Sequence, residues 1–389
     1  MAGRSATTEA IPGLDSEKAK RYSRARLVAL GASTVWTVVR LAWFSWSGRS
    51  TRLRGAADRV APDARLAAAV YLAATTFLAW LTNLPVSYAG GHQVERRFGL
   101  TKQSNRGWLA DQVKGLGLGL GLQVPLLTAA FAVIRRRPRD WWLILAGATV
   151  PLAVVLSNLA PVLILPLFNR FEPLRDRALA DRVRTLADRA EVPIADVFQM
   201  DMSRQTEKPN AFFAGLGNTK RIVLSDTLIE RFETEEIEAV VAHELGHQVH
   251  GDIWRLIAVS GGLGVAASYA LAKLTPPLVR STARQSGVRS IGDEASLPSL
   301  GLVMALVGFF MAPIQAAFSR AIERRTDRFA LELTGNGGAY ASTMARLATQ
   351  SLADPDPSRA TVFFLYSHPP IAERIATARA FETERGAAS

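Results

Sequence analysis

Cysteine is absent from the 389-residue sequence, and histidine occurs at only five positions. Without cysteine, the chain can form neither disulfides nor thiolate-bound metal centres such as iron–sulfur clusters. A bound metal ion would therefore have to be held by histidine, aspartate or glutamate. The histidines are His92, His243, His247, His250 and His368.

Charged residues are also sparse: they make up 21% of the chain, against about 25% in an ordinary soluble domain. The apolar residues are gathered into long blocks instead of recurring at helical or strand spacing, which is typical of helices that span a bilayer. Six blocks are each about long enough to cross roughly 30 Å of hydrocarbon. They cover residues 27–46, 66–88, 115–134, 141–168, 253–271 and 297–318.

These blocks divide the chain into five regions. Residues 1–26 form a basic tail, 27–168 a region of four spans, 169–252 a polar region, 253–318 a hairpin of two spans, and 319–389 a charged region with a helical pattern. The first block is too long for the apolar part of a signal peptide and lacks a nearby cleavage pattern, so we interpret it as a retained anchor. The sequence predicts a predominantly α-helical, multi-pass membrane protein with a small α+β domain inserted between the fourth and fifth spans.

The chain carries a formal net charge of +12, which could indicate binding to nucleic acid. However, lysine and arginine lie mainly beside the apolar blocks, as at Arg24, Arg26 and 135–137. Contact with anionic lipid headgroups explains this placement better, so we expect membrane lipids and no nucleic acid among the partners. Lysine and arginine are nearly even across the loops, and the charge pattern therefore leaves the orientation in the membrane open.

Two features within the spans are unusual. Arg40 lies inside the first apolar block, where a charge is costly, so its side chain should face the protein interior or a water-filled space, or else extend to the membrane interface. In the third block, Gly117 and Gly121 would form a face of small residues suited to close helix packing. A flexible apolar helix without a specific partner is an equal alternative for that block.

The polar region has the pattern of a small α+β domain. Residues 174–190 form an amphipathic helix with many charges on its outer face. A second helix, with carboxylates in its first turn, begins near Thr234 and continues to about His250. Three short apolar or mixed runs separated by polar turns indicate a small sheet. They lie at 197–200, 211–214 and 221–224.

The second helix carries a group of residues suited to metal-dependent hydrolysis. His243 and His247 are four residues apart, so their imidazoles stack on one face of a helix and can reach a single cation about 2.0–2.1 Å from each nitrogen. Glu244 would flank the cation and can accept a proton from a water molecule that the cation activates. The alternative is that these residues share a surface helix by chance. Histidine is too scarce for this to be a good explanation, and the apolar residues at 240–242 indicate a buried helix.

A catalytic zinc site usually takes three protein ligands and leaves one position for water, so a third ligand is required. The best candidate is Glu323, directly after the sixth apolar block. Asp327 lies one helical turn further on the same face, where it could accept a hydrogen bond from a ligating histidine and fix its tautomer. Alternatively, both carboxylates are surface groups that pair with nearby arginines. We expect one zinc ion per chain, held by His243, His247 and Glu323.

The pattern His243-Glu244-x-x-His247, followed much later by Glu323-x-x-x-Asp327, resembles the gluzincin membrane peptidases of family M48. This family includes the type I CAAX prenyl endopeptidase and the bacterial HtpX heat-shock protease. Further segments are similar to the CAAX-protease pattern. They are 95–100 with Trp108 and Asp111, 166–171, 210–215, 220–228, and 367–370 with Arg374. The similarity runs from about residue 95 to residue 374 and favours the CAAX protease over HtpX, whose chain is shorter at the N-terminus.

The resemblance implies roles for further residues. Asn210, Ala211 and Phe212 would lie at an edge strand that pairs with the substrate backbone. His368 would donate to the oxyanion of the tetrahedral intermediate, with Arg374 nearby as a second positive group. From the sequence pattern alone, His368 is a histidine in a turn before proline.

The other two histidines receive no catalytic role. His250 lies seven residues after His243, so it is either a fourth ligand or a structural residue, and we favour the structural role. His92 falls in an expected loop. The family arrangement also implies a catalytic domain on the cytoplasmic side, for this chain in the plasma membrane of a bacterium. Eukaryotic members have seven spans around a large water-filled chamber, whereas six are expected here.

These patterns predict an integral membrane zinc metalloendopeptidase that hydrolyses peptide bonds with a zinc-activated water. Its substrate would be a peptide or protein, lipidated or associated with the membrane, and bound in extended form. A membrane-protein quality-control protease like HtpX and a non-hydrolytic zinc-binding scaffold are the alternatives. A scaffold has no need of a base such as Glu244 beside the metal, and this favours the peptidase.

Overall fold

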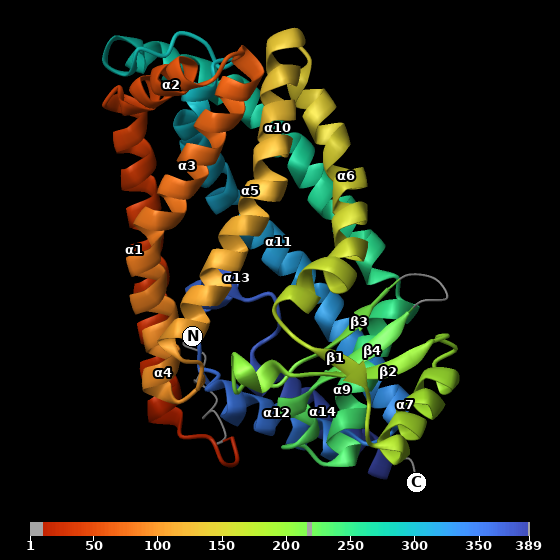
Figure 1. Ribbon diagram of the computed structural model, residues 1–389. Coiled ribbons are helices and arrows are strands. Elements are labelled where there is room, and N and C mark those ends of the chain that lie inside the picture. The colour runs from red at the N-terminus through yellow and green to blue at the C-terminus, as the bar shows by residue number, and fades with distance from the viewer. Residues whose placement is uncertain (1–10, 216–219, 388–389) are drawn as a thin grey trace, which may run out of the picture.

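The computed structural model describes residues 11–215 and 220–387 of the chain (Figure 1). Within these residues, six helices are long and apolar enough to cross a membrane, as the sequence predicts. They are α1 (Ser16–Trp46), α3 (Ala64–Ser87), α5 (Asn105–Arg136), α6 (Trp141–Leu159), α10 (Asp252–Ser286) and α11 (Leu297–Thr334). Two of them continue as short helices: α3 through η1 (Tyr88–Gln93) into α4 (Val94–Phe98), and α6 through η2 (Ala160–Ile164) into η3 (Leu165–Leu167).

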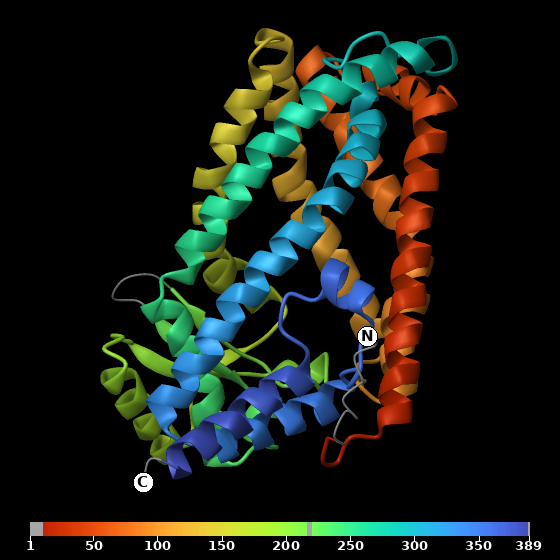
Figure 2. The same cartoon turned by 180° about the vertical axis from the view of Figure 1, so that it is seen from behind.

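The six spanning helices form a ring. Neighbours in the ring pack against each other in the order α1, α3, α5, α6, α10 and α11, and α11 returns to α1. The short helix α2 (Arg49–Val60) lies across one end of the ring, while the sheet and the helices within residues 177–249 and 337–386 gather at the other end (Figures 1 and 2). The chain therefore has a membrane part that α2 covers at one end. The other end carries the sheet and the predicted catalytic residues, and we call it the catalytic end.

Two of the helices extend beyond the apolar blocks that the sequence indicates. The sequence suggests a tail up to residue 26, but α1 begins at Ser16, where the Asp15 side chain accepts a hydrogen bond from the Lys18 backbone and caps the helix. The sequence also suggests a polar loop at 273–296, but α10 continues to Ser286. The extra turns of α10 bury apolar side chains such as Val279. Tertiary packing thus extends this helix beyond the apolar block.

Four short strands form one sheet at the catalytic end, in the order β1, β2, β4, β3. They are β1 (Phe171–Pro173), β2 (Asp196–Met200), β3 (Ala211–Ala214) and β4 (Arg221–Ser225). The last three were expected from the sequence, whereas β1 is too short to give a periodic signal. Strand β3 is an edge strand, antiparallel to β4, with Ala211 opposite Leu224. Its outer side is open to another extended chain.

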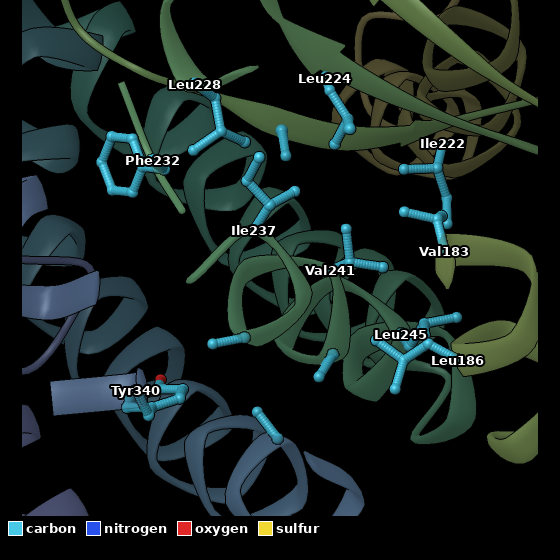
Figure 3. Packing of buried hydrophobic residues seen from close by; sticks show 14 of the residues in the cluster. Val183, Leu186, Ile222, Leu224, Leu228, Phe232, Ile237, Val241, Leu245 and Tyr340 are labelled. Atoms are coloured by element: carbon cyan, nitrogen blue, oxygen red, sulfur yellow. The ribbon is translucent and has the colours of Figure 1, made fainter. Parts of the chain in front are cut away.

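One hydrophobic core joins the sheet to helices from distant parts of the chain (Figure 3). The helices are α7 (Arg177–Arg189), α8 (Asp226–Ile229), α9 (Thr234–Val249), α12 (Gly337–Ser351), α14 (Ile371–Gly386) and the end of α11. Val183 of α7, Leu224 of β4 and Val241 of α9 meet in this core, and Tyr340 of α12 closes it from the other side. The regions 169–252 and 319–389 therefore share one core, although two spans separate them in the sequence.

Glu207 joins the membrane part to the catalytic end. Its backbone N–H donates to the carbonyl of Leu100, at 2.9 Å, in the loop between α4 and α5. Its buried carboxylate pairs with Lys102 of the same loop, at 3.0 Å, and with Arg231 of the catalytic end. Burial would raise the pKa of the Glu207 carboxyl, but these two cations outweigh burial and lower it.

A second buried carboxylate holds the opposite end of the ring together. Glu294, in η6 (Glu294–Ser296), pairs with Arg54 of α2 at 3.2 Å and with Arg135 of α5. Arg135 belongs to the basic run that the sequence assigns to lipid headgroups. Here its guanidinium neutralises a buried carboxylate and ties α5 to the start of α11.

Candidate active site

Helix α9 places two histidines on one face because its start and its end are both fixed. At its start, Glu233 and Glu236 form a reciprocal capping box. At its end, Gly251 adopts a left-handed conformation with φ of 62°, which ends α9 and starts α10. His243 and His247 lie one turn apart between these points, with ring centroids separated by 4.8 Å.

A glycine inside the motif allows a second helix to come close. A Cβ atom at Gly246 would lie only 2.9 Å from the Thr326 side chain and 3.0 Å from that of Phe329. Both belong to α11, so the missing side chain lets α9 and α11 pack closely. This contact brings Glu323 of α11 to the two histidines. Helix α11 therefore extends beyond the predicted span at 297–318 and continues to Thr334 as part of the site.

His243, His247 and Glu323 offer ligand atoms that all lie within 4.8 Å of one another. The Nε2 atom of His243 is 3.1 Å from one Glu323 oxygen, and Nε2 of His247 is 3.7 Å from the other. A tetrahedral ion with bonds of about 2.0–2.1 Å needs its ligand atoms about 3.3 Å apart. The Glu323 Oε2 atom is buried and has no hydrogen-bond partner among the described residues. The donor set and its spacing therefore fit a small divalent cation.

The second nitrogen of each imidazole has its own carboxylate. Nδ1 of His243 lies 3.0 Å from Asp327, the partner that the sequence suggests. Nδ1 of His247 lies 3.0 Å from Asp252, which sequence reasoning missed. Asp252 is the first residue of α10, and the turn at Gly251 directs it back to the histidine. Each carboxylate orients its ring so that Nε2 points to the shared site.

Asp327 is itself held by buried donors. Arg374 of α14 donates two hydrogen bonds to its carboxylate, at 2.9 and 2.6 Å, and the Tyr340 hydroxyl donates a third at 2.5 Å. Burial would lower the pKa of Arg374, but Tyr340 and Asp327 outweigh burial and raise it. Arg374 is therefore a permanent positive charge behind His243. Tyr340 was not expected from the sequence.

The electrostatics of the site favour a positive charge. Burial would lower the pKa of His243, but its contacts with Asp327 and Glu323 outweigh burial and raise the pKa to about 9. The two carboxylates thus create a strong preference for a cation at this point. Burial raises the pKa of the Glu244 carboxyl, against the opposing effect of His243 and His247.

His368 lies beside the Glu323 carboxylate, with Nε2 at 3.3 Å and a side chain that is 55% exposed. Its Nδ1 atom is 2.9 Å from the Ser367 hydroxyl. The preceding helix α13 (Arg359–Leu365) is fixed by Arg320, which donates to the carbonyls of Val362 and Tyr366 at 2.9 and 2.6 Å. Arg320 lies one turn before Glu323 on α11, so one helix positions both the carboxylate and the loop that carries His368.

The expected substrate-binding residues lie at the open edge of the sheet. Ala211 and Phe212 belong to β3, which also contacts α9. Asn210 immediately precedes the strand and has an exposed side chain, while its carbonyl accepts a hydrogen bond from the Ser225 backbone at 2.9 Å. The open edge and the histidine helix are therefore neighbours.

The remaining two histidines lie apart from the site. His250 packs edge-on against Phe329 and is not among the grouped ligand residues. The sequence suggests that His92 lies in a loop, but this residue is buried in η1. It lies 3.1 Å from the Asn105 side chain and stacks on Trp108. These contacts give His92 a packing role.

Comparison with known proteins agrees with this geometry. Residues 173–382 match the description "Peptidase family M48", and residues 5–170 match "CAAX prenyl protease N-terminal, five membrane helices". Only four candidate spans of the described residues, α1, α3, α5 and α6, lie in the second matched segment.

Individual relatives cover most of the chain. The sequence is 31% identical to "Uncharacterized metalloprotease YhfN" of Bacillus subtilis, over 96% of this chain and 90% of that protein. It is 28% identical to "CAAX prenyl protease 1" of Saccharomyces cerevisiae, over 78% of this chain and 70% of the relative. The crystal structure of S. mikatae Ste24p matches with a TM-score of 0.83 and 25% identity, over 94% of this chain and 90% of that chain.

These similarities extend over both the membrane ring and the catalytic end, and the grouped histidines and glutamate are those that a metal-dependent peptidase needs. The chain belongs to peptidase family M48 and is a multi-pass membrane metalloprotease.

Proposed function

We propose that this metalloprotease uses one zinc ion per chain, held by His243, His247 and Glu323. The convergence of two imidazole Nε2 atoms on one buried carboxylate, while each Nδ1 has a separate carboxylate partner, supports this most directly. Nitrogen and oxygen ligands in this number suit zinc. Zinc bound there would polarise the scissile carbonyl and lower the pKa of the attacking water.

Glu244 is the general base. Its carboxylate accepts the proton of the attacking water and then transfers it to the leaving amine. Burial raises the pKa of Glu244 in the direction of neutral pH. This helps the carboxylate both to accept and to release the proton. His368, exposed beside Glu323, donates to the oxygen on which negative charge develops.

Arg374 and Asp327 act through His243. Both are buried, and Arg374 donates to Asp327, which also contacts His243 Nδ1. This arrangement fixes the orientation of the imidazole and keeps Nε2 available. Arg374 also contributes a positive charge near the site, although it is too enclosed to meet a substrate directly.

The scissile segment binds extended along Asn210, Ala211 and Phe212. The free edge of β3 offers backbone donors and acceptors, and its contact with α9 places the bound chain beside the histidines. Backbone pairing gives affinity with little sequence preference. A peptide or protein in extended form is therefore a better substrate than a folded domain.

The natural substrate carries an apolar or lipidated portion. Helix α9 leads through Gly251 directly into the span α10, and Glu323 lies on the same helix as the sixth span. The site is thus at the membrane boundary, where an apolar anchor gains about 0.8 kcal/mol per buried CH₂. We place the protein in a bacterial plasma membrane with its catalytic end toward the cytoplasm, in contact with membrane lipids and without nucleic acid.

Cleavage of a fluorogenic peptide by the detergent-purified protein tests this function. A chelator should abolish cleavage, and added zinc should restore it. Cleavage that persists after complete removal of the metal would contradict a metal-dependent reaction, and zinc binding without any cleavage would indicate a scaffold.

Matched peptides with and without a prenyl or long acyl group test the substrate class. We expect a higher kcat/KM for the lipidated peptide. Equal values for both, together with efficient digestion of a folded soluble protein, would contradict a membrane-level site and favour a general quality-control protease.

A further inference from the structure

A cavity of about 1130 Å³ lies inside the ring, bounded by α1, α2, α3, α5 and α11. It is larger than most pockets for small ligands, which occupy about 300–1,000 Å³. Part of its wall is apolar, with side chains such as Leu41, Phe44 and Leu53, and part carries hydroxyl or amide groups, such as Thr37 and Gln123. A ligand that fills it must therefore have both polar and apolar parts.

The charges of this cavity are unevenly distributed. Among its described lining residues, four carry a formal charge: Arg40, Arg49, Arg52 and Asp111. The Asp111 carboxylate already has partners, because it accepts a hydrogen bond from Gln103 at 2.6 Å and forms an ion pair with Lys114. The three arginines lie at the other end, in the last turns of α1 and the first turn of α2. This end of the cavity is strongly cationic.

None of the three arginines forms an ion pair with any residue in 11–215 or 220–387. The Nε atom of Arg40 is buried and has no hydrogen-bond partner there. Arg49 lies over the ring of Trp43, at 4.3 Å from its centroid, which positions it without neutralising it. The sequence indicates that Arg40 inside a span should face an interior space, and the cavity is that space. Arg40 therefore has a donor that no described residue satisfies and a charge that no described carboxylate balances, and an anion in the cavity would supply both partners.

The phosphate of a membrane lipid fits this requirement. A guanidinium binds phosphate through two parallel hydrogen bonds, and arginine is preferred over lysine where such recognition occurs. The cavity lies among spanning helices, so its natural source of amphiphiles is the bilayer. The cavity volume is about 1130 Å³. This is room for a phosphate-bearing headgroup and the first part of an acyl chain.

We propose that the cavity is a binding site for an anionic phospholipid, with the lipid phosphate held by Arg40 and with Arg49 and Arg52 at the same end. Tyr22 of α1 lies beside Lys208 of the catalytic end, and Arg40 is about 27 Å further along the helix at about 1.5 Å per residue. None of the candidate active-site residues is among the described residues that line the cavity, so the phosphate position at Arg40 lies apart from them. The bound lipid fills the ring between α1, α3 and α5 and supports its structure.

Native mass spectrometry of the full-length, delipidated protein tests this inference. Phosphatidylglycerol and phosphatidylcholine of equal chain length are titrated separately, and inorganic phosphate is added as a competitor. We expect the first phosphatidylglycerol to bind at least ten-fold more tightly than the first phosphatidylcholine, with little competition from millimolar phosphate. Equal affinities for the two lipids would overturn the site, and full displacement by inorganic phosphate would overturn the assignment to a lipid.

Arg40→Gln should remove the preference for phosphatidylglycerol, whereas Arg40→Lys should retain part of it. Arg24→Gln is the matched control, because it removes the same charge from an exposed position of the same helix that does not line the cavity. Equal losses in Arg40→Gln and Arg24→Gln would show surface attraction only. If Arg40→Gln does not fold, Arg52→Gln, which removes a cavity-lining arginine from α2, replaces it. An unchanged preference in Arg52→Gln would then contradict the inference.

Discussion

The candidate active site and the cavity inside the ring differ in how far their charged groups are paired. At the catalytic end, His243, His247 and Asp327 each contact at least one oppositely charged or hydrogen-bonding group, and Arg374 closes the network. In the cavity within the ring, Arg40 has no ion-pair partner among the described residues. A centre whose charged groups mostly pair with one another is already organised for its ligand, whereas an unpaired charge depends on its ligand for charge balance.

The difference predicts how each centre responds to mutation. In the active site, removing one side chain leaves its buried partners without a hydrogen bond or a compensating charge. Single substitutions there should therefore have large effects on activity and metal binding, and the size should depend on the group removed. In the unpaired centre, the lipid composition of the surroundings should matter as much as the side chains. The following changes test the paired centre and its connections, from the largest expected effect to the smallest.

Glu244→Gln removes the base from the paired centre without changing its shape. We expect kcat to fall by about 10³–10⁴-fold, because an amide oxygen cannot accept the proton of the attacking water. Zinc content should remain at about one per chain. Glu235→Gln, on the exposed first turn of the same helix, is the control and should keep full turnover. Retention of most activity in Glu244→Gln would remove Glu244 from the mechanism.

His247→Ala and Glu323→Ala break the ligand group directly. We expect metal analysis of either variant to show less than about one tenth of the wild-type zinc, because two ligands hold the ion far less tightly than three. His250→Ala is the control on the same helix and should retain its zinc. Undiminished zinc in Glu323→Ala would exclude Glu323 as a ligand.

Asp252→Asn tests the partner that the turn at Gly251 brings to His247. Zinc affinity should fall by about 10–100-fold, since a neutral amide orients the imidazole less firmly and makes it a weaker ligand. The measurement is a competition titration against a chromophoric chelator. Asp188→Asn, an exposed aspartate on α7, provides the comparison. The same affinity in both variants would show that Asp252 is only structural.

Arg320→Gln should weaken the hold on α13 and on the loop that carries His368. We expect kcat/KM to fall by about ten-fold through misplacement of His368, with unchanged zinc content. Arg320→Lys should recover part of the loss because it keeps one donor. The control is Arg324→Gln, an exposed arginine that pairs with Glu373. Loss of zinc together with activity would place the effect at Glu323 instead of His368.

Glu207→Gln tests the link between the catalytic end and the membrane part. The cations Arg231 and Lys102 lower the pKa of Glu207 in the folded protein despite its burial. Because the folded pKa lies below the unfolded one, its stabilising effect is present above about pH 4.5 and is lost as the pH falls through the folded value. At neutral pH the variant should lose about 1–2 kcal/mol of unfolding free energy.

The pH dependence separates this effect from a simple packing loss. The difference in stability between wild type and Glu207→Gln, measured by thermal unfolding in detergent, should shrink as the pH is lowered below about 4. Glu230→Gln, at an exposed position, should show no such dependence. A difference that stays constant with pH would contradict an ionic role for Glu207.

The sequence predicts part of this arrangement and misses the rest for identifiable reasons. The spacing of His243 and His247 and the four-residue step from Glu323 to Asp327 follow from helical geometry, which is local. Asp252 could not be predicted, because its contact with His247 depends on the left-handed turn at Gly251. Tyr340 reaches Asp327 only through tertiary packing of α12.

Helix boundaries show the same limit. The apolar blocks give the number of spans, because bilayer thickness sets a minimum length. They do not give the ends of α10 or α11, where buried contacts beyond the apolar blocks stabilise further helical turns. The strand β1 is too short for any periodic signal, and only its pairing with β2 defines it.

The continuity of α11 has a consequence for protein engineering and for evolution. This single 38-residue helix begins at the far side of the ring and ends beneath the catalytic core, with Glu323 near its last third. A soluble fragment made from residues 169–252 would lack the third ligand, the Tyr340 side of its core and the Arg374 network. The peptidase therefore cannot be separated from its anchor as a module. Its membrane and catalytic parts must be inherited, expressed and inhibited as one unit.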